Sequence, residues 1–297
     1  MAGAEFGRMS PFPGPRFSVQ SPPRLSVSIV LHHSEPALLW ATLASLDAAA
    51  ERAVSEGVVE AVEVVLVDNA SAPDYLESLQ HQCSQMTFAA VALRWLPQPD
   101  NSGFGAGHNR ALAGLQSDLH LVLNPDVELD AQALCEGIRV LVQRPEVGLV
   151  CPAVSRPDGA PDYLCKRYPS LVVLLLRGFA PRFVKRLFRG MLDHYEARDI
   201  IDAGVPANVE IASGCFMLLR TSGLVAIEGF DEGYFLYFED FDLSLRLREA
   251  GVGTLLYWPD MRIIHHGGDA ARKGSHHVRY FLRSARRFFA QHGWRLW

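Results

Sequence analysis

Three carboxylates stand close together in a strongly aromatic stretch of the sequence. They are Glu239, Asp240 and Asp242, and the residues around them include Phe230, Tyr234, Phe235, Tyr237, Phe238 and Phe241. Burial beside aromatic surface and repulsion between like charges raise the pKa of some carboxyls, whereas helix N–H groups lower the pKa of others. Such a group can supply a general base. An acidic first helical turn packed on an aromatic core explains the same residues equally well.

Two further stretches end in acids that could contact a nucleotide or a metal ion. Asp68 and Asn69 follow an apolar run, and a carboxylate there can accept a hydrogen bond from a base N–H or a ribose hydroxyl; the alternative is an Asx turn that starts the next helix. His32, with His33, follows the first apolar run and could line the same pocket or lie on the surface. Asp126, in Asn124-Pro125-Asp126, could hold a divalent cation that bridges a diphosphate, or could only cap a helix.

A glycine-rich stretch lies between these acids in the sequence, from Asn101 to Arg110. Its three glycines would let the backbone approach a ligand closely, and the N–H groups of a following helix would suit a phosphate. The spacing matches neither the dinucleotide-binding GxGxxG pattern nor a Walker loop, which requires a Lys followed by Ser or Thr. A plain strand-to-helix turn therefore remains an alternative.

The elements that must position these residues alternate between apolar strands and helices. Strands are predicted over 26–31, 62–68, 88–96, 120–124 and 147–151, and helices over 36–50, 75–85, 106–116 and 130–143. The acids at 239–242 would open another helix that ends near Gly251, although the alternating Leu243, Leu245 and Leu247 also fit a strand. Short unbroken apolar strands between helices indicate a mostly parallel sheet covered on both faces, and such sheets bind ligands at the carboxyl ends of their strands.

Composition excludes several classes of protein. The 297 residues carry a net charge of -5 with a pI near 6.1, so the sequence offers no general attraction to nucleic acid. Five scattered cysteines without a CxxC pair indicate a reducing compartment. The proline-rich residues 1–24 are expected to be a disordered leader, and because no apolar run reaches the ~18 residues of a membrane span, the chain should be soluble or lie on a membrane surface.

Two segments combine basic and apolar residues. Between 161 and 199, Leu, Val and Phe are interleaved with Lys166, Arg167, Arg177, Arg182, Lys185, Arg186 and Arg189. A basic amphipathic helix there could rest on an anionic leaflet, or the segment could be a mobile loop and helix packed over the acceptor side. The C-terminal residues 276–297 predict a second such helix, which could pack on the domain, touch lipid or form a dimer contact.

Taken in order, the motifs SIVL, VDNAS, NSGFGAGHNRAL, LNPD, SGCFMLLR, GFDEGYFLYFEDFDLSLR and IIHHGG resemble the family 2 inverting glycosyltransferases of GT-A fold, most closely their bacterial rhamnosyltransferase-like branch. The resemblance runs from about Ser26 to Gly268. It implies an α/β fold with a Rossmann-like, mostly parallel central sheet flanked by helices, a smaller acceptor-side subregion and a C-terminal helix. Residues 25–270 would form one domain, with a nucleotide-binding half (25–125) and an acceptor and catalytic half (126–270), followed by the basic helix of 271–297.

The resemblance also implies roles for individual residues. Asp240 would be the catalytic base, with Glu239 and Asp242 positioning it or the acceptor, and Asp126 and His265 would bind a Mg or Mn cation. The donor would be bound by His32, Asp68, Asn69, Asn101, Gly103, Gly107, Asn109 and Asn124. Two departures from the family pattern stand out: the first acid of its DxD motif is replaced here by Asn124, which leaves one anionic ligand, and His266 competes with His265.

The implied reaction transfers a sugar with inversion and without a covalent intermediate. The donor would be a nucleotide diphosphate sugar, dTDP- or UDP-linked, and the acceptor a saccharide or a lipid-linked molecule of bacterial surface polysaccharide or lipopolysaccharide synthesis. L-Rhamnose is the sugar expected, with UDP-galactofuranose or another hexose donor as alternatives. A non-catalytic sugar-nucleotide-binding subunit and a sugar-nucleotide hydrolase are the other hypotheses. The expected location is the cytoplasm, with peripheral contact to the inner face of the inner membrane.

Overall fold

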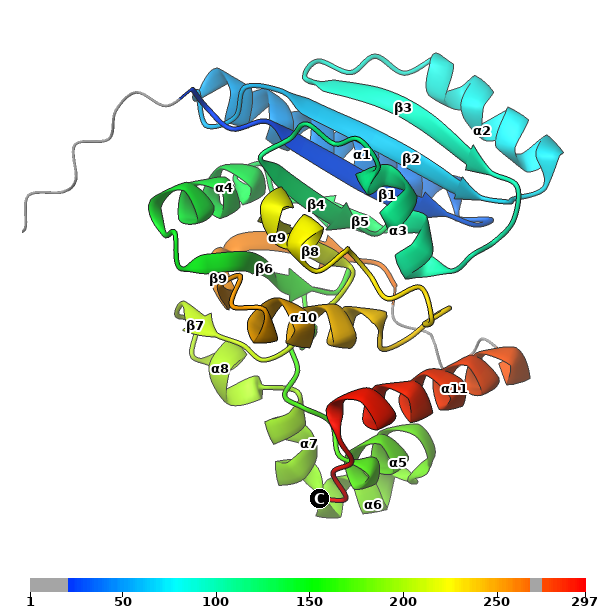
Figure 1. Cartoon of the computed structure of the whole chain (residues 1–297), viewed down its shortest axis with the longest axis vertical. Coiled ribbons are helices and arrows are strands. Elements are labelled where there is room, and N and C mark those ends of the chain that lie inside the picture. Colours follow the sequence, from blue (N-terminus) through cyan, green and yellow to red (C-terminus); the bar gives the residue numbers. More distant parts are fainter. Residues whose placement is uncertain (1–20, 268–273) are drawn as a thin grey trace, which may run out of the picture.

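The computed structural model describes residues 21–267 and 274–297, so most of the expected leader lies outside the described residues. Its centre is a nine-stranded sheet of order β3-β2-β1-β4-β8-β6-β9-β5, with β7 paired to β9 (Figure 1). The strands are β1 (Leu25–Leu31), β2 (Val62–Asn69), β3 (Val91–Gln98), β4 (Leu119–Leu123), β5 (Val127–Leu129), β6 (Val147–Ser155), β7 (Ala207–Asn208), β8 (Phe216–Arg220) and β9 (Thr254–His265). The helices are α1 (Pro36–Ser55), α2 (Pro73–Ser84), α3 (Phe104–Leu112), α4 (Ala133–Gln143), α5 (Leu171–Phe179), α6 (Arg182–Leu187), α7 (Arg189–Tyr195), α8 (Arg198–Asp202), α9 (Thr221–Ala226), α10 (Glu239–Glu249) and α11 (Gly274–His292).

The α/β sheet expected from the sequence is confirmed, and its parallel character is concentrated in one half. Strands β3, β2, β1 and β4 are mutually parallel, whereas β8 runs antiparallel to β4 and β6, and β5 runs antiparallel to β9. The second half is therefore mixed. Only the three residues Asn124–Asp126 separate β4 from β5, yet β5 pairs with β9 at the edge of the sheet and not with β4.

The helix expected after the acidic cluster is also confirmed, and the strand alternative is wrong. Helix α10 begins at Glu239, has its acids in the first turn and its arginines in the last, and is followed by Gly251 at a φ of 66°. Buried Leu243 and Leu247 lie four residues apart on one side of this helix, against the sheet. Burial on one face thus overrides the weak alternating pattern.

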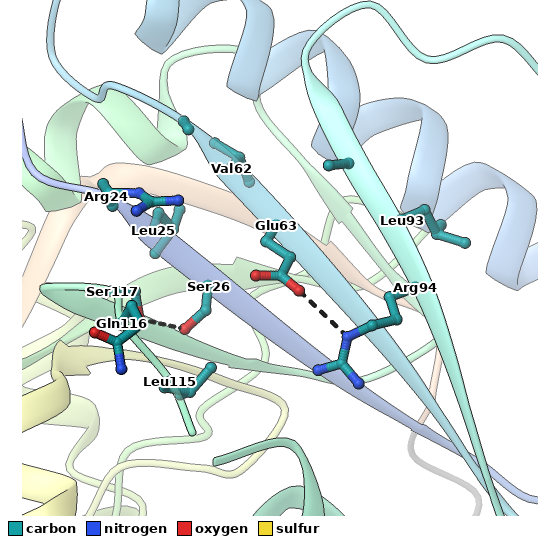
Figure 2. Close-up of a pocket in the computed structure, with 12 residues that line it drawn as sticks. Arg24, Leu25, Ser26, Val62, Glu63, Leu93, Arg94, Leu115, Gln116 and Ser117 are labelled. Atoms are coloured by element: carbon teal, nitrogen blue, oxygen red, sulfur yellow. Dashed lines mark hydrogen bonds and ion pairs between the residues drawn. The ribbon is translucent and has the colours of Figure 1, made fainter. Parts of the chain in front are cut away.

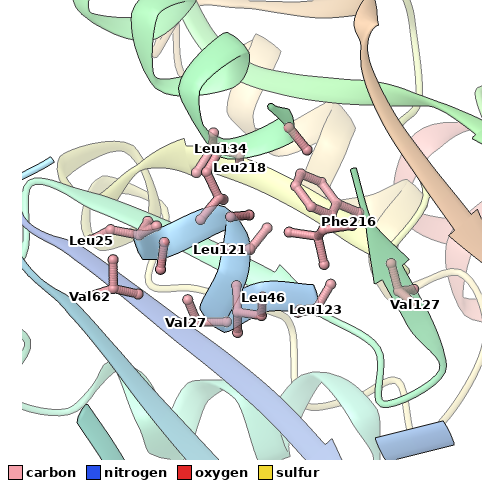
Figure 3. Packing of buried hydrophobic residues seen from close by; sticks show 14 of the residues in the cluster. Leu25, Val27, Leu46, Val62, Leu121, Leu123, Val127, Leu134, Phe216 and Leu218 are labelled. Carbon is pink, nitrogen blue, oxygen red and sulfur yellow. The ribbon is translucent and has the colours of Figure 1, made fainter. Parts of the chain in front are cut away.

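Helices cover both faces of the sheet. On one face α1, α2 and α4 enclose the largest core cluster, in which Leu46, Leu121 and Phe216 meet (Figure 3). On the other face α3, α9 and α10 enclose a second cluster that includes Val122, Leu219 and Leu243. This arrangement is the two-sided cover that unbroken apolar strands require.

A third cluster lies outside the sheet. It joins Leu174 of α5, Phe288 and Phe289 of α11, and the aromatic residues Tyr234 and Phe238 that precede α10. Figure 1 shows α5 to α8 and α11 gathered beneath the sheet, as the smaller subregion predicted from the sequence. Among the described helices, none combines the length and apolar character needed to cross a membrane.

Candidate active site

The end of β2 holds the first group of predicted site residues. Asp68 is buried, and its Oδ2 accepts a hydrogen bond from the Ser71 N–H at 3.1 Å, so the Asx turn considered from the sequence is present. Its Oδ1 is buried and has no hydrogen-bond partner within the described part of the chain. One carboxylate oxygen thus shapes the turn and the other remains able to accept a donor from a ligand.

His32 and the glycine-rich loop gather around the same strand end. Nδ1 of His32 lies 2.9 Å from the carbonyl oxygen of Asn69, and Nδ2 of Asn69 donates to the carbonyl oxygen of Gly103 at 2.8 Å. A side chain at Gly107 would meet Val30 and Asn69 at 2.9–3.0 Å, so a glycine is needed there for close packing. His32, Asp68, Asn69 and the loop at Gly103 are therefore brought together as the sequence predicted.

Two asparagines of the glycine-rich stretch serve the backbone instead. Oδ1 of Asn101 accepts from the Gly103 N–H at 3.0 Å and fixes the start of α3. Asn109 uses both ends of its amide on Phe230, donating to its carbonyl oxygen at 2.9 Å and accepting from its N–H at 2.8 Å. Asn109 thus ties α3 to the segment before α10, which is a positioning role that its place in the loop did not suggest.

The pairing of β5 with β9 places Asp126 beside His265. Val127 is registered opposite His265, and the Asp126 carbonyl oxygen accepts from the His266 N–H at 2.9 Å. The Asp126 Oδ1 and His265 Nε2 atoms are 3.6 Å apart, and Oδ1 is buried without a hydrogen-bond partner in the described residues. A cation between the two side chains would satisfy that oxygen, so the pair fits a metal whose other ligands come from phosphate and water.

His266 points away from this pair. Its Nε2 lies 2.6 Å from Oε1 of Glu128, on the other side of the strand. Side chains alternate along a strand, so consecutive histidines face opposite ways. Of the two candidates, only His265 lies beside Asp126. No group of three or more His, Cys, Asp and Glu side chains that could hold a metal occurs in residues 21–267 or 274–297.

Asp162 is a site residue that the sequence did not indicate. Its Oδ2 lies 3.6 Å from Nδ1 of His265, so the imidazole stands between two carboxylates. Burial tends to raise the pKa of Asp162, but its interactions with His265 and with the more distant Arg156 outweigh burial and lower that pKa overall. Asp162 lies in the loop after β6, which ends at Ser155. No motif surrounds it in the sequence, so no sequence signal could have identified it.

The three acids of α10 have three different surroundings. Asp240 accepts hydrogen bonds from the N–H groups of Gly214 at 3.0 Å and Phe241 at 2.9 Å. Burial raises the pKa of Asp240, against the opposing effects of these N–H groups and of the Lys166 charge. Burial, and then the charge of Asp240, raise the pKa of Glu239 well above its ordinary value, and Oε2 of Glu239 is buried without a hydrogen-bond partner in the described chain.

Asp242, by contrast, is fully engaged in structural contacts. Its Oδ2 lies 2.7 Å from Nε of Arg246, and its Oδ1 lies 2.8 Å from Nε2 of His292 on α11. With both oxygens occupied and only 1% of its surface exposed, Asp242 fastens α11 to α10. The expected role of positioning the base or the acceptor is not supported by these contacts.

Residues 213–215 connect the acids of the two halves. A Cβ placed on Gly214 would lie 3.1 Å from the Phe104 ring and 3.3 Å from Cβ of Asp240, so the glycine-rich loop and the acidic helix meet there. The neighbouring Cys215 carbonyl oxygen accepts from the Asn124 N–H at 2.9 Å. Burial raises the pKa of the Cys215 thiol, and the nearby charges of three carboxylates raise it further: Asp126, Asp162 and Asp240.

Lys166 adds a buried positive charge to the same region. Its ammonium group donates to the carbonyl oxygen of Tyr163 and lies 5.7 Å from the centre of the Tyr195 ring. Burial, assisted by the charge of Arg177, lowers the pKa of Lys166 to about 8. Because the ammonium charge lowers the pKa of Asp240, Lys166 favours the ionised form of that acid.

A separate hollow lies at the opposite rim of the sheet. It is formed where β1, β2 and β3 begin, and Figure 2 shows Ser26 and an ion pair of Glu63 with Arg94 on its walls. Ligands of open α/β sheets bind at the carboxyl ends of strands, and this hollow is at the amino ends. It is therefore not the candidate active site.

Comparison with known proteins identifies a protein family and several relatives of this chain. Residues 26–221 match the family described as "Glycosyl transferase family 2". The chain is 30% identical to "N-acetylglucosaminyl-diphospho-decaprenol L-rhamnosyltransferase" of Mycobacterium tuberculosis (strain ATCC 25618 / H37Rv) over 261 residues, which is 81% of this chain and 77% of that protein. It is 31% identical to "Rhamnosyltransferase WbbL" of Escherichia coli (strain K12) over 198 residues, or 64% of this chain and 70% of that protein.

Two solved structures share the fold at low sequence identity. One is the mannosyltransferase PcManGT of Pyrobaculum calidifontis in complex with GDP-Man and Mn²⁺, with a TM-score of 0.58 and 16% identity, over 91% of this chain and 64% of that one. The other is GalNAc-T7 with UDP, GalNAc and Mn²⁺, with a TM-score of 0.59 and 16% identity, over 84% of this chain and 44% of that one. Both likenesses support the GT-A fold predicted from the sequence.

Proposed function

This chain belongs to glycosyl transferase family 2, and from that premise we propose that it moves a sugar from a nucleotide diphosphate donor to a saccharide or lipid-linked acceptor with inversion. The observation that carries the proposal is the placement of Asp240. Two backbone N–H groups hold its carboxylate at the start of α10, next to Phe104 of the glycine-rich loop and, through residues 214 and 215, close to Asp126. The proposed base therefore lies beside the proposed donor loop, and the proposed metal-binding acid is in the same region of the structure.

Asp240 acts as the general base in this proposal. The acceptor hydroxyl gives its proton to the Asp240 carboxylate while its oxygen attacks the anomeric carbon of the donor sugar. The bond between that carbon and the diphosphate oxygen breaks on the opposite face, and the nucleoside diphosphate leaves with the bonding electrons. One displacement inverts the configuration, so no covalent sugar-enzyme intermediate forms.

The donor is held on the nucleotide-binding side. The free Oδ1 of Asp68 would accept a hydrogen bond from the base, and His32 and Asn69 line the same strand end. Gly103 and Gly107 would serve the donor indirectly, because they let the loop pack closely against Phe235, Val30 and Asn69. Asn101 and the Asn124 backbone fix the adjoining turns. Asp126 and His265 would hold a Mg²⁺ or Mn²⁺ ion, which when bound would neutralise charge on the departing diphosphate.

The sugar and the acceptor are proposed from the relatives. Two of them bear the name rhamnosyltransferase, and one is named for a diphospho-decaprenol acceptor. L-Rhamnose from a dTDP donor is accordingly the first choice, with UDP-galactofuranose or another hexose donor as alternatives. The product would belong to a bacterial surface polysaccharide or lipopolysaccharide, and a lipid-borne acceptor would bring the protein to the inner face of the inner membrane.

The test is transfer measured with purified protein, Mg²⁺ or Mn²⁺, a panel of nucleotide sugars and lipid-linked acceptors. Asp240→Asn should lower turnover by about 100-fold or more, because general base catalysis contributes at least that factor. Donor affinity measured by calorimetry should stay unchanged. Glu249→Gln, at the far end of the same helix with a side chain 68% exposed, is the matched control and should transfer at the wild-type rate.

Three outcomes would contradict parts of the proposal. Near wild-type turnover by Asp240→Asn would remove the base. Donor binding without product for any donor would favour a binding subunit. Loss of donor at the same rate with and without acceptor would indicate a hydrolase.

A further inference from the structure

A group of large apolar side chains stands out from the subregion beneath the sheet. The most exposed are Phe183 and Leu187 of α6, at 75% and 80% of their surface, and Trp297 at 78%. We call the apolar face the set Leu175, Phe179, Phe183, Leu187, Trp294, Leu296 and Trp297. Single exposed apolar residues are ordinary, but several on adjoining elements indicate an interaction surface.

Hydrogen bonds hold the parts of the apolar face together. The N–H groups of Leu171 and Val172, in the first turn of α5, donate to the carbonyl oxygens of Arg295 and Leu296 at 2.9 and 3.3 Å. Nζ of Lys185 on α6 donates to the carbonyl oxygen of Arg177 on α5 at 2.7 Å. Figure 1 shows α5, α6 and the C-terminus side by side at the lower end of the molecule.

Positive charge exceeds negative charge around the apolar face, even though Arg177 and Arg189 form ion pairs with Glu196 and Asp193. Residues 171–192 contain five Lys or Arg and no Asp or Glu, and residues 274–297 contain five Arg and no acid, whereas the whole chain has a net charge of -5. Arg182 and Arg186 are exposed between the apolar side chains of α6. Cations mixed with aromatic and leucine side chains are typical of helices that lie in the interface of an anionic membrane.

We propose that the apolar face docks the protein onto an anionic lipid bilayer. Its apolar side chains would enter the boundary between headgroups and acyl chains, and Arg182, Lys185, Arg186 and Arg295 would pair with lipid phosphates. A second copy of the chain is disfavoured as the occupant, because a two-fold contact of this face with itself would set arginines against arginines. An anionic bilayer matches both the apolar and the charged features.

The helices that carry the apolar face share a core cluster with the segment that leads into the proposed catalytic helix α10. Leu174 of α5 and Phe288 of α11 share a cluster with Phe238, and Asp240 is two residues beyond Phe238. Docking would therefore bring the catalytic base close to the bilayer surface. This consequence rests on the proposed function, since it assigns the side from which a lipid-linked acceptor arrives.

Co-sedimentation of the full chain with vesicles tests the docking. The protein should bind vesicles of phosphatidylcholine with about one-third phosphatidylglycerol, and binding should weaken as salt is raised or the anionic lipid is omitted. The double substitution Phe183→Glu with Leu187→Glu should weaken binding at least about tenfold. Val225→Glu is the matched control, because Val225 is 68% exposed on α9, outside the apolar face, and binding should be unchanged.

A second pair of variants measures how much the positive charges contribute to vesicle binding, apart from the apolar side chains. Arg182→Glu with Arg186→Glu should also lose at least about tenfold in binding, whereas Arg94→Glu on β3 should bind as the wild type does. Wild-type protein that stays in the supernatant with all vesicles would overturn the proposal. So would equal binding by the α6 variants, or a dimer seen by light scattering that the Phe183→Glu and Leu187→Glu changes dissociate.

The rate of sugar transfer to a water-soluble acceptor distinguishes a loss of membrane docking from a loss of catalytic activity. The α6 variants should keep the wild-type rate in that assay and lose rate only with an acceptor embedded in vesicles. If transfer fails for the wild type while vesicle binding behaves as expected, the proposed function is wrong and the docking surface stands.

Discussion

Asp240 and Glu239 are adjacent residues with very different hydrogen bonding. Asp240 receives two backbone N–H groups, whereas one oxygen of Glu239 is buried without a partner in the described residues. Their proton affinities are linked by proximity, so the two acids titrate as a pair with shared apparent pKa values. Burial raises the pKa of both, and the N–H groups make Asp240 the acid that ionises first.

This arrangement predicts the acidic limb of the rate profile. As pH falls through the raised pKa of Asp240, the carboxylate takes up a proton and kcat/KM should fall about tenfold per pH unit. The limb should lie at a higher pH than the ordinary aspartate pKa of 3.8. Lys166→Met removes the charge that lowers the Asp240 pKa, so the limb should move further toward neutral pH.

The measurement is kcat/KM with a water-soluble acceptor from pH 4 to 8, at pH steps that resolve a shift of about half a unit. Lys185→Met serves as the control, because the Lys185 ammonium group on α6 donates to the carbonyl oxygen of Arg177, away from Asp240 in the sequence and in its contacts. A limb that stays in place in Lys166→Met would show that this ammonium group does not influence the base.

Asp162 supports a second prediction at this scale. A carboxylate beside the second nitrogen of a metal-binding histidine fixes the orientation of the ring, and its loss costs about 10- to 100-fold in metal affinity. Asp162→Asn should therefore weaken the affinity for Mn²⁺ by about 10- to 100-fold. The affinity is measured by calorimetry in the presence of excess dTDP. Asp158→Asn, in the exposed turn nearby, should leave the affinity unchanged, and an unchanged affinity in Asp162→Asn would exclude the positioning role.

Some residues of the candidate site could be predicted from the sequence, and others could not. Asp68, Asp126 and Asp240 each follow a strand or open a helix, so their positions suggested chemistry. Asp162 touches His265 across more than 100 residues of chain, and no local pattern encodes that contact. The different surroundings of Asp240 and Asp242 also depend on α11, because His292 of that helix occupies one oxygen of Asp242.

At the scale of elements, the glycine-rich loop and the segment before α10 are built against each other. The Phe104 N–H, at the start of α3, donates to the Phe235 carbonyl oxygen at 3.0 Å. Gly103 has a φ of 97°, and a Cβ there would collide with the backbone of Phe235. The proposed donor side and the proposed catalytic side therefore share one backbone contact.

Gly103→Ala should disrupt that contact. The collision and the unfavourable φ together should lower the free energy of unfolding by at least about 1–3 kcal/mol and weaken donor binding. Gly114→Ala is the control, because Gly114 also has a positive φ of 77° but nothing lies within 4 Å of its Cβ position. Urea denaturation and donor titration are carried out on both variants. Gly114→Ala reports the effect of the positive φ alone, and Gly103→Ala reports the positive φ together with the collision against Phe235. Equal effects in the two variants would mean that the contact with Phe235 is unimportant.

Elements were predicted well where apolar runs were long and poorly where they were short. The parallel strands β1, β2 and β4 follow from unbroken apolar runs, and helices were expected between them. β5 has three residues and β7 has two, which is too little sequence for a recognisable period, and both gain their pairing from β9. The antiparallel half of the sheet therefore depends on long-range contacts that sequence patterns do not contain.

At the scale of the whole molecule, α11 is part of the folded unit. Phe288 and Phe289 are 0% and 1% exposed and pack with the aromatic residues before α10. His292 adds its contact to Asp242. The sequence predicted a basic amphipathic helix here and left its partner open; packing on the domain is the arrangement observed for its apolar side. The expected boundary at residue 270 lies outside the described residues and stays a prediction.

Phe288→Ala tests whether α11 and the sheet unfold together. Removing a fully buried phenylalanine should lower the free energy of unfolding by about 3–5 kcal/mol in a single urea transition. Leu282→Ala on the same helix, 56% exposed, should change it by about 0.5 kcal/mol or less. A separate early transition, with the main one unmoved, would show that α11 is an independent appendage.

Arg246 gives the loop before α10 its shape. Its guanidinium donates to the carbonyl oxygens of Ile227 and Gly229, both at 2.8 Å, while its Nε contacts Asp242. A loop that is already fixed loses little freedom when a substrate arrives, so more of each new contact is available as affinity. Under the proposed function the acceptor hydroxyl reaches Asp240 at the end of this loop. Exchanging exposed side chains on the fixed backbone is then a route to a new acceptor preference that does not require rebuilding the loop itself.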